Sequence, residues 1–250
     1  MTGNQPTTRQ RLVLRTKPHQ KTPIMYHKWR NLLFLHWQFD PDIIQSTLPK
    51  GLRVDIYDGR AYLGVVPFRM QAVRPRFFPS LPLISDFLEL NLRTYVYDDQ
   101  ANPGVWFYSL DANQKLAVKI ARQFYGLPYF HARMKAKLND KSGFIRFSSL
   151  RRGVGSEYRS TFSYRGGGEI NEAEPDSLEF FLVERYLLFS KRGAKLYRGR
   201  IHHPPYPLIG AEVRQWDEHL FHLNGFEIPG RPPDHMLYSS GVDVQVYALE

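Results

Sequence analysis

Glu89 is the residue whose type and position are best suited to acid–base chemistry. It lies in residues 87–97, where alternating side chains predict a β-strand. A carboxylate directed into the interior of a folded sheet has its pKa raised by desolvation, and such a group can act as a general acid or base. The alternative is that Glu89 faces water or pairs with Arg93 on the same strand. The sequence leaves both arrangements open.

The histidines do not form the pattern of a metal site. His202 and His203 are adjacent, so in a strand they point to opposite faces. His219 and His222 are three residues apart on a predicted helix and give one ligand pair at most. The chain has no cysteine, which excludes disulfides, thiolate metal sites and cysteine nucleophiles. We therefore expect no metal and no cofactor.

Residues 121–138 are expected to position the side chains that could take part in a reaction. A helix is predicted over residues 114–124, with its apolar side chains on one face, and Gly126 and Pro128 predict a turn after it. Residues 130–138 then alternate strictly between apolar and basic side chains, which predicts a strand with one buried and one solvated face.

The wider pattern is one of many short strands with a few helices. The Asp58-Gly59 pair predicts a tight hairpin turn, since both positions tolerate positive φ angles. We expect an α+β, mainly β fold with a curved, antiparallel, barrel-like sheet, because closure removes exposed edges. An open α+β sheet is the alternative. Residues 24–250 are expected to form a single domain and the polar residues 1–23 a flexible tail, of which residues 1–20 are expected to be dispensable.

Composition and charge restrict the partners. The net charge of +10 could attract nucleic acid, an anionic metabolite or a protein partner, but a solvated basic face is the simpler reading. Nucleic acid is disfavoured, because the aromatic residues fall mostly on core-facing positions. We find no apolar run long enough to cross a membrane and no signal-peptide pattern, so we expect a cytoplasmic protein without a membrane anchor.

A series of short signatures resembles one known family in their order along the chain. They are His36-Trp37, Asp40-Pro-Asp42, Leu48-Pro-Lys-Gly-Leu52, Val65-Val-Pro-Phe68, Trp106-Phe-Tyr-Ser-Leu-Asp-Ala112, Phe124-Tyr-Gly-Leu-Pro-Tyr129, Glu179-Phe-Phe-Leu-Val-Glu-Arg-Tyr186, Leu196-Tyr-Arg-Gly-Arg-Ile-His202 and Tyr238-Ser-Ser-Gly-Val-Asp243. Together they resemble the YqjF-like family of uncharacterised proteins, which shares the acetoacetate-decarboxylase-like fold. The resemblance covers roughly residues 26–249 and implies that fold, but it carries no established reaction.

The decarboxylase resemblance also implies site residues. The decarboxylase has an Arg on its first strand, pocket-facing Glu residues and a lysine pair directly after a Pro. Arg30 matches that Arg and Glu89 matches a pocket Glu, while a second family Glu falls near Val66 and is lost. Tyr129 stands in the place of the lysine that forms the Schiff base, and Phe130 in that of its neighbour. A phenol cannot form an imine, so amine-dependent decarboxylation is disfavoured.

Two functions remain open at this point. The first is an enzyme with acid–base chemistry of the lyase or hydrolase kind, binding a small carboxylate or carbonyl compound. Glu89 would be its acid or base, with Arg30, Tyr129, Arg122 and Tyr125 as ligand-binding residues; the last two lie on the matched helix. The second is a non-catalytic protein that binds a ligand or partner through an aromatic cavity or its basic face. The fold resemblance also allows a homo-oligomer.

Overall fold

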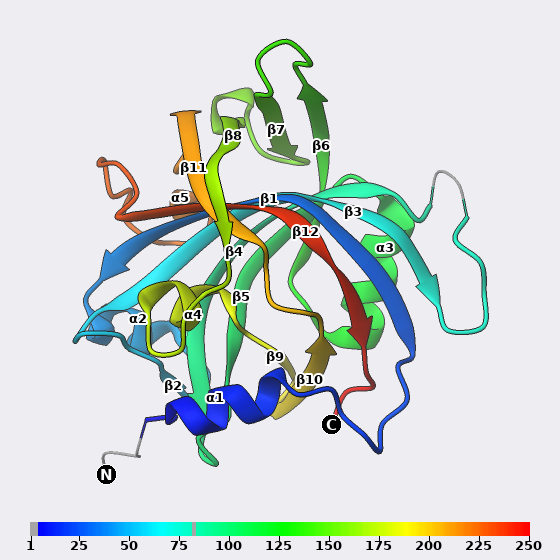
Figure 1. Cartoon of the computed structure of the whole chain (residues 1–250), viewed down its shortest axis with the longest axis vertical. Coiled ribbons are helices and arrows are strands. Elements are labelled where there is room, and N and C mark those ends of the chain that lie inside the picture. The colour runs from blue at the N-terminus through cyan, green and yellow to red at the C-terminus, as the bar shows by residue number, and fades with distance from the viewer. Residues whose placement is uncertain (1–4, 82–83) are drawn as a thin grey trace.

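The computed structural model describes residues 5–81 and 84–250, and strands dominate it (Figure 1). The strands are β1 (Met25–Phe39), β2 (Leu52–Val54), β3 (Ala61–Pro75), β4 (Phe87–Asp98), β5 (Pro103–Ala112), β6 (Tyr129–Leu138), β7 (Ile145–Arg151), β8 (Ser160–Asn171), β9 (Leu187–Arg192), β10 (Lys195–His202), β11 (Leu208–Gln215) and β12 (His235–Val246). The helices are α1 (Thr8–Arg15), α2 (Pro41–Thr47), α3 (Lys115–Ile120), α4 (Leu178–Val183) and α5 (His219–Leu223), with a π-helical turn (Ala121–Tyr125) and a short 3-10 turn (Ser156–Tyr158).

The strands form one sheet that curves back on itself. Its order is β10-β9-β5-β6-β7-β8-β11-β12-β1-β3-β4-β2, and the further pairings β4–β5 and β10–β12 join its parts into a ring. All pairings are antiparallel except β5–β6 and β5–β9. The β10–β12 pairing holds only two residue pairs, so the sheet is a curved ring rather than a true barrel. The predicted mainly β, curved and largely antiparallel fold is confirmed.

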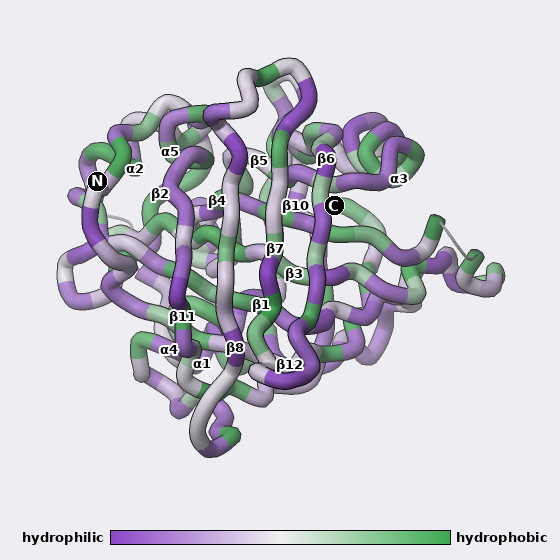
Figure 2. The backbone as a smooth tube through the Cα atoms, turned by 90° about the horizontal axis from the view of Figure 1, so that it is seen from above, coloured by the Kyte–Doolittle hydropathy of each residue, from purple (hydrophilic) through white to green (hydrophobic). Residues whose placement is uncertain are grey.

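The two larger apolar cores lie on the two faces of the curved sheet. The inner core lies inside the ring and includes Phe34, Phe68 and Tyr129. The outer core lies on the other face of β1, β3 and β4 and includes Leu33 and Phe162. Figure 2 shows why both faces are buried: β6, β7, β8 and β11 run across β1 and β3 as a second layer.

The segment expected to be a flexible tail contains a docked helix. Thr7 caps α1 in a capping box with Gln10, and Figure 1 shows the helix lying across one end of the curved sheet. Arg11 of α1 is only 9 % exposed and forms two 2.8 Å hydrogen bonds to the carboxylate of Asp55. Residues 8–15 of this segment thus form a helix that contacts the sheet through a buried ion pair, in place of the apolar contacts that its polar composition lacks.

The predicted helix over residues 114–124 is divided in two. The α-helix α3 spans Lys115–Ile120, and a π-helical turn follows until Gly126, whose φ of 61° ends it. The expected apolar face is only partly buried, since Leu116 and Ile120 are 46 % and 40 % exposed. The wider π turn departs from the regular period of 3.6 residues on which that expectation rested.

Two other local predictions are confirmed. Asp58 and Gly59 have φ angles of 47° and 73° and close the turn bridged by Tyr57 and Arg60. Along β6, Ala132 and Met134 are buried while Arg133 and Lys135 are exposed, as the alternation predicts. Among the described residues, no helix is long and apolar enough to cross a membrane.

Candidate functional site

Strand β4 directs a row of polar side chains into the inner core. Leu88, Leu90 and Leu92 belong to the outer core, so the alternate residues of this regular strand face inward. The inward row is Phe87, Glu89, Asn91, Arg93 and Tyr95, and each of these side chains is at most 9 % exposed. The carboxyl group of Glu89, the amide of Asn91 and the guanidinium of Arg93 thus lie in line inside the ring.

Glu89 and Tyr129 form a buried pair. The Tyr129 hydroxyl donates a 2.8 Å hydrogen bond to the Glu89 carboxylate, and the Asn91 amide donates a longer one of 3.4 Å. Glu89 is 2 % exposed and Tyr129 is 8 % exposed. Tyr129 reaches this position because the π turn and Gly126 lead the chain into β6, whose first residue pairs with Leu110 of β5.

Burial decides the protonation of this pair. Desolvation raises the pKa of Glu89 to about 7, although the hydrogen bonds from Tyr129 and Asn91 act in the opposite direction. The pKa of Tyr129 is raised well above 10, first by burial and then by the neighbouring Glu89 carboxylate. Near neutral pH, therefore, Glu89 can either give or accept a proton, while Tyr129 stays a hydrogen-bond donor.

Arg93 lies further along the same face of β4. Its guanidinium packs 5.5 Å from the ring centre of Phe34 and 5.6 Å from that of Tyr95. One nitrogen donates a 3.3 Å hydrogen bond to the Leu182 carbonyl. No ion pair joins Arg93 to Glu89 or to any other carboxylate in the described ranges. The Glu89–Arg93 pair that the sequence allows is therefore absent.

A buried cluster of three charged side chains lies beneath α1. Asp55, which is fully buried, receives hydrogen bonds from Arg11 and, at 2.6 Å, from Arg185. Burial and the nearby Arg11 lower the pKa of Arg185 to about 10, while Asp55 opposes this. One carboxylate therefore holds two guanidiniums, one from α1 and one from the residues that follow α4.

The residue expected to bind a carboxylate, Arg30, lies away from Glu89. On β1, Trp29 packs in the inner core, and Arg30 points to the opposite face, where it forms an ion pair with Asp243. Its side chain is 30 % exposed. A bulge beside it, at Asn31 with a φ of 55°, inserts one residue relative to β3 and reverses the face of the residues that follow.

The other expected ligand-binding residues lie on the helical segment after α3. Arg122 is exposed to solvent. Tyr125 packs partly against the inner core, and burial raises its pKa. The structure thus brings Glu89 and Tyr129 together, with Tyr125 at the edge of the same core and Arg122 and Arg30 outside it.

Sequence reasoning missed Asn91 and Arg93 as inward-facing residues of the site. The signal was present, because positions 89, 91 and 93 share one face of any regular strand. From the sequence, Arg93 is expected only as a partner of Glu89, since charged residues are rarely buried without a partner.

The described residues contain no group of three His, Asp or Glu side chains that could hold a metal ion. A surface hollow of about 280 Å³ lies at the end of β8, lined in part by Glu169, Glu172, Glu174 and Glu179. This acidic hollow is separate from the buried Glu89–Tyr129 pair.

Comparison with known proteins identifies relatives at two levels. The family model DUF2071, described as an uncharacterized conserved protein, matches residues 26–243. The uncharacterized protein YqjF of Bacillus subtilis is 38 % identical over 228 residues, covering 90 % of this chain and 91 % of that protein.

Solved structures show the fold. The enduracididine biosynthesis enzyme MppR complexed with pyruvate has a TM-score of 0.60 and 12 % identity, covering 92 % of this chain and 91 % of that one. An acetoacetate decarboxylase from Legionella pneumophila has a TM-score of 0.62 and 11 % identity, covering 92 % and 88 %. At such low identity these structures establish an acetoacetate-decarboxylase-like fold and nothing about the reaction.

Proposed function

We propose that this chain, which belongs to the DUF2071 family of uncharacterised conserved proteins, binds a small carboxylate or carbonyl compound inside its curved sheet, with Glu89 as acid or base. The observation that carries the proposal is the buried Glu89–Tyr129 pair. A carboxyl group with a pKa of about 7 is divided between its two protonation states at neutral pH, as a general acid–base catalyst requires.

Such a pair is costly to the fold, which favours a functional reason for it. A rise in pKa from the ordinary 4.5 to about 7 corresponds to about 3 kcal/mol, at roughly 1.4 kcal/mol per pKa unit. A buried apolar residue at position 89 would avoid this cost. Strongly perturbed groups of this kind gather at functional sites.

The proposed chemistry does not use a Schiff base. Tyr129 occupies the position of the amine nucleophile in the decarboxylase resemblance, and its hydroxyl already donates to Glu89. Lys119 and Lys135, the nearest lysines before and after Tyr129 in the sequence, are both exposed. In the inferred reaction, the single Tyr129 O–H shifts its hydrogen bond from Glu89 to the carbonyl oxygen of the bound ligand. Glu89 then takes a proton from the carbon beside the carbonyl, and the enolate oxygen that forms accepts the hydrogen bond from Tyr129.

The ligand class rests on two supports. The acid–base pair suits a compound with an acidic carbon–hydrogen bond next to a carbonyl. One solved structure of the same fold is a complex with pyruvate, a small oxo acid, which makes such acids the first ligands to try.

The chain could also assemble into a homo-oligomer, which sedimentation would reveal.

The experiment is deuterium exchange into small oxo acids, followed by proton NMR. Pyruvate, acetoacetate and levulinate are incubated with the protein in deuterated buffer. We expect enzyme-dependent loss of a proton signal beside the carbonyl of at least one acid, and loss of this activity in Glu89→Gln. Glu157→Gln, which changes an exposed glutamate, is the matched control. Exchange at the uncatalysed rate for every acid, or full exchange by Glu89→Gln, would refute the acid–base role.

A non-catalytic binding protein is the second candidate. The inner core around Arg93 is aromatic: Phe34 and Tyr206 contact edge to face at 5.4 Å, and Tyr206 lies 4.6 Å from the ring of His203. Ligand-dependent thermal stabilisation without any deuterium exchange would support this function instead.

A further inference from the structure

Arg93 is a buried arginine that has no carboxylate partner among the described residues. It is 9 % exposed, its only described hydrogen bond is the 3.3 Å contact to the Leu182 carbonyl, and its Nε atom is buried with no partner. An unpaired buried charge costs several kcal/mol unless something compensates for it. Replacing such a group by an apolar residue is often neutral or stabilising, so a purely structural role for the guanidinium is disfavoured.

Other buried polar atoms on the same inner face also lack partners. The indole Nε1 of Trp29 is a buried donor, and the Oδ1 of Asn91 is a buried acceptor, and neither has a hydrogen bond among the described residues. Buried polar groups normally find partners, and unpaired ones call for an explanation such as a missing ligand. Trp29, Asn91 and Arg93 therefore each carry one buried hydrogen-bonding atom that has no partner among the described residues.

A chain of contacts between aromatic rings of the inner core leads from Trp29 to Arg93. The ring of Trp29 lies 6.1 Å from that of His203, which lies 4.6 Å from Tyr206. Tyr206 contacts Phe34, and Phe34 stacks beneath the Arg93 guanidinium. The charge of Arg93 contributes to the lowered pKa of His203, which burial lowers first and most, to about 4. Arg93 on β4 and Trp29 on β1 therefore both border the inner core.

From this arrangement we propose that Arg93 binds the carboxylate of the ligand. A guanidinium matches a carboxylate in charge and in geometry, and its bonds to carboxylates are among the strongest in proteins. The inference rests on the proposed function and assigns the anchoring role to Arg93 in place of Arg30, whose guanidinium is already paired with Asp243 on the opposite face of β1.

The spacing along β4 sets the kind of acid. Arg93 and Glu89 are four residues apart on a regular strand, so their Cα atoms are about 13 Å apart. Asn91 lies between them, with its free Oδ1 available to a hydroxyl or amide donor. An acid anchored at Arg93 reaches Glu89 best when several carbons separate its carboxylate from its carbonyl. The ligand class is therefore an oxo acid longer than pyruvate, of which levulinate is the simplest probe.

The test compares levulinate with its methyl ester, which has the same carbonyl but no carboxylate. Binding is measured by calorimetry and by thermal shift for the wild type, Arg93→Met and Arg30→Met. Met keeps the apolar stem of Arg without its charge, and Arg30→Met makes the same change on the outer face. We expect levulinate to bind about 10- to 100-fold more weakly to Arg93→Met, as loss of a charged hydrogen bond predicts, and unchanged to Arg30→Met. The ester should bind equally weakly to all three.

The outcomes separate this inference from the proposed function. Equal levulinate affinity in Arg93→Met and wild type would overturn the role of Arg93, while exchange lost in Glu89→Gln would still support the acid–base role. Weaker binding by Arg30→Met alone would return the anchoring role to Arg30. Should Arg93→Met fail to fold, Arg93→Lys keeps the charge but loses the planar fork, and an unchanged affinity in it would equally contradict the proposal. If no acid in the panel binds the wild type, both ideas fall.

Discussion

The docking of α1 through Arg11 makes a quantitative prediction about stability. In Arg11→Met the carboxylate of Asp55 loses two 2.8 Å hydrogen bonds but keeps Arg185 at 2.6 Å. Hydrogen bonds to charged groups contribute about 1.5–3 kcal/mol each, and removing Arg11 also relieves its repulsion of Arg185. We therefore expect a net loss of about 2 kcal/mol.

The measurement is thermal unfolding followed by circular dichroism. For a chain of this size, about 2 kcal/mol lowers the melting temperature by roughly 4–8 °C. Asp55→Asn should cost more, about 3–5 kcal/mol, because it leaves two buried guanidiniums facing a neutral amide. Which of the two variants loses more stability is as informative as the size of each loss.

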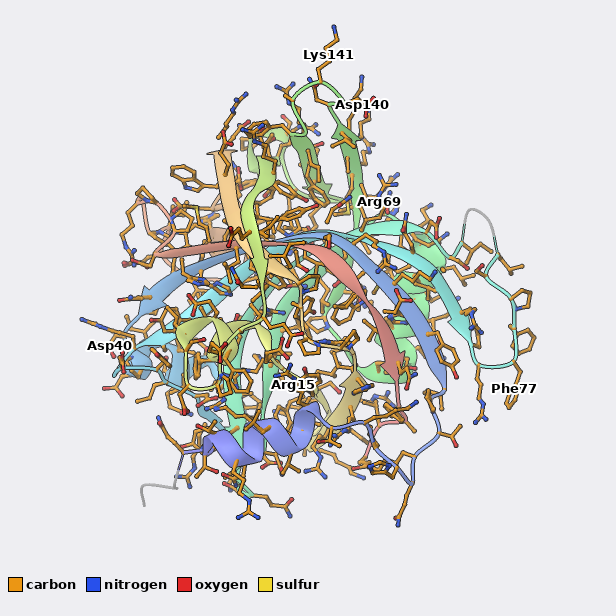
Figure 3. The ribbon with its side chains drawn as sticks, viewed as in Figure 1. Arg15, Asp40, Arg69, Phe77, Asp140 and Lys141 are labelled. Carbon is orange, nitrogen blue, oxygen red and sulfur yellow. The ribbon has the colours of Figure 1, made fainter. Side chains whose placement is uncertain are left out.

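The matched control is another arginine of the same helix. Arg15, labelled in Figure 3, pairs with Glu172 at 2.8 Å, but the two side chains are 26 % and 64 % exposed. Exposed pairs of this kind contribute about 0–1 kcal/mol, so Arg15→Met should melt close to the wild type. If Arg11→Met melts within about 1 °C of the wild type, α1 is not held by this ion pair and the tail is dispensable, as its composition alone suggested.

Three further predictions concern Glu89, the lysines and Gly104. Because the folded-state pKa of Glu89 lies above its unfolded value, the wild type should lose stability as pH rises from about 4.5 to 7. The stability difference between Glu89→Gln and the wild type should therefore shift by about 3 kcal/mol in favour of the variant across that range, and urea unfolding at both pH values checks it. With acetoacetate and borohydride, no lysine should gain a covalent adduct; a mass increase on Lys119 or Lys135 would contradict the absence of Schiff-base chemistry. In Gly104→Ala the added Cβ would lie 2.7 Å from the Phe189 ring and 2.8 Å from the Leu187 carbonyl, so the variant should melt several degrees lower, and an unchanged melting temperature would show that β5 and β9 can separate.

The sequence predicts the fold well because its strongest signals are local. The alternation along β6 and the Asp58-Gly59 turn depend on neighbouring residues, and both are present in the structure. The order of the family signatures extends this local information to the whole chain, and the family and the fold are confirmed.

The site could be predicted only in part, because it depends on which face each residue takes. Glu89 and Tyr129 meet as the resemblance implies, since both lie on regular strands. The bulge at Asn31 breaks the alternation of β1, and no local pattern marks it, so the position of Arg30 could not be derived. The docking of α1 depends on a partner 44 residues away in sequence, which a polar composition does not reveal.

Direct titration of the Glu89 carboxyl group tests the central claim. The carbonyl stretch of a protonated carboxylic acid is followed by infrared difference spectroscopy from pH 4 to 9, with Glu89→Gln used to assign the band. We predict that this band disappears with a midpoint near pH 7, and that Tyr129→Phe moves the midpoint higher, because the lost hydrogen bond stabilises the carboxylate. A midpoint near 4.5 that Tyr129→Phe leaves unchanged would show an ordinary, solvated carboxylate, and the acid–base role of Glu89 would be wrong.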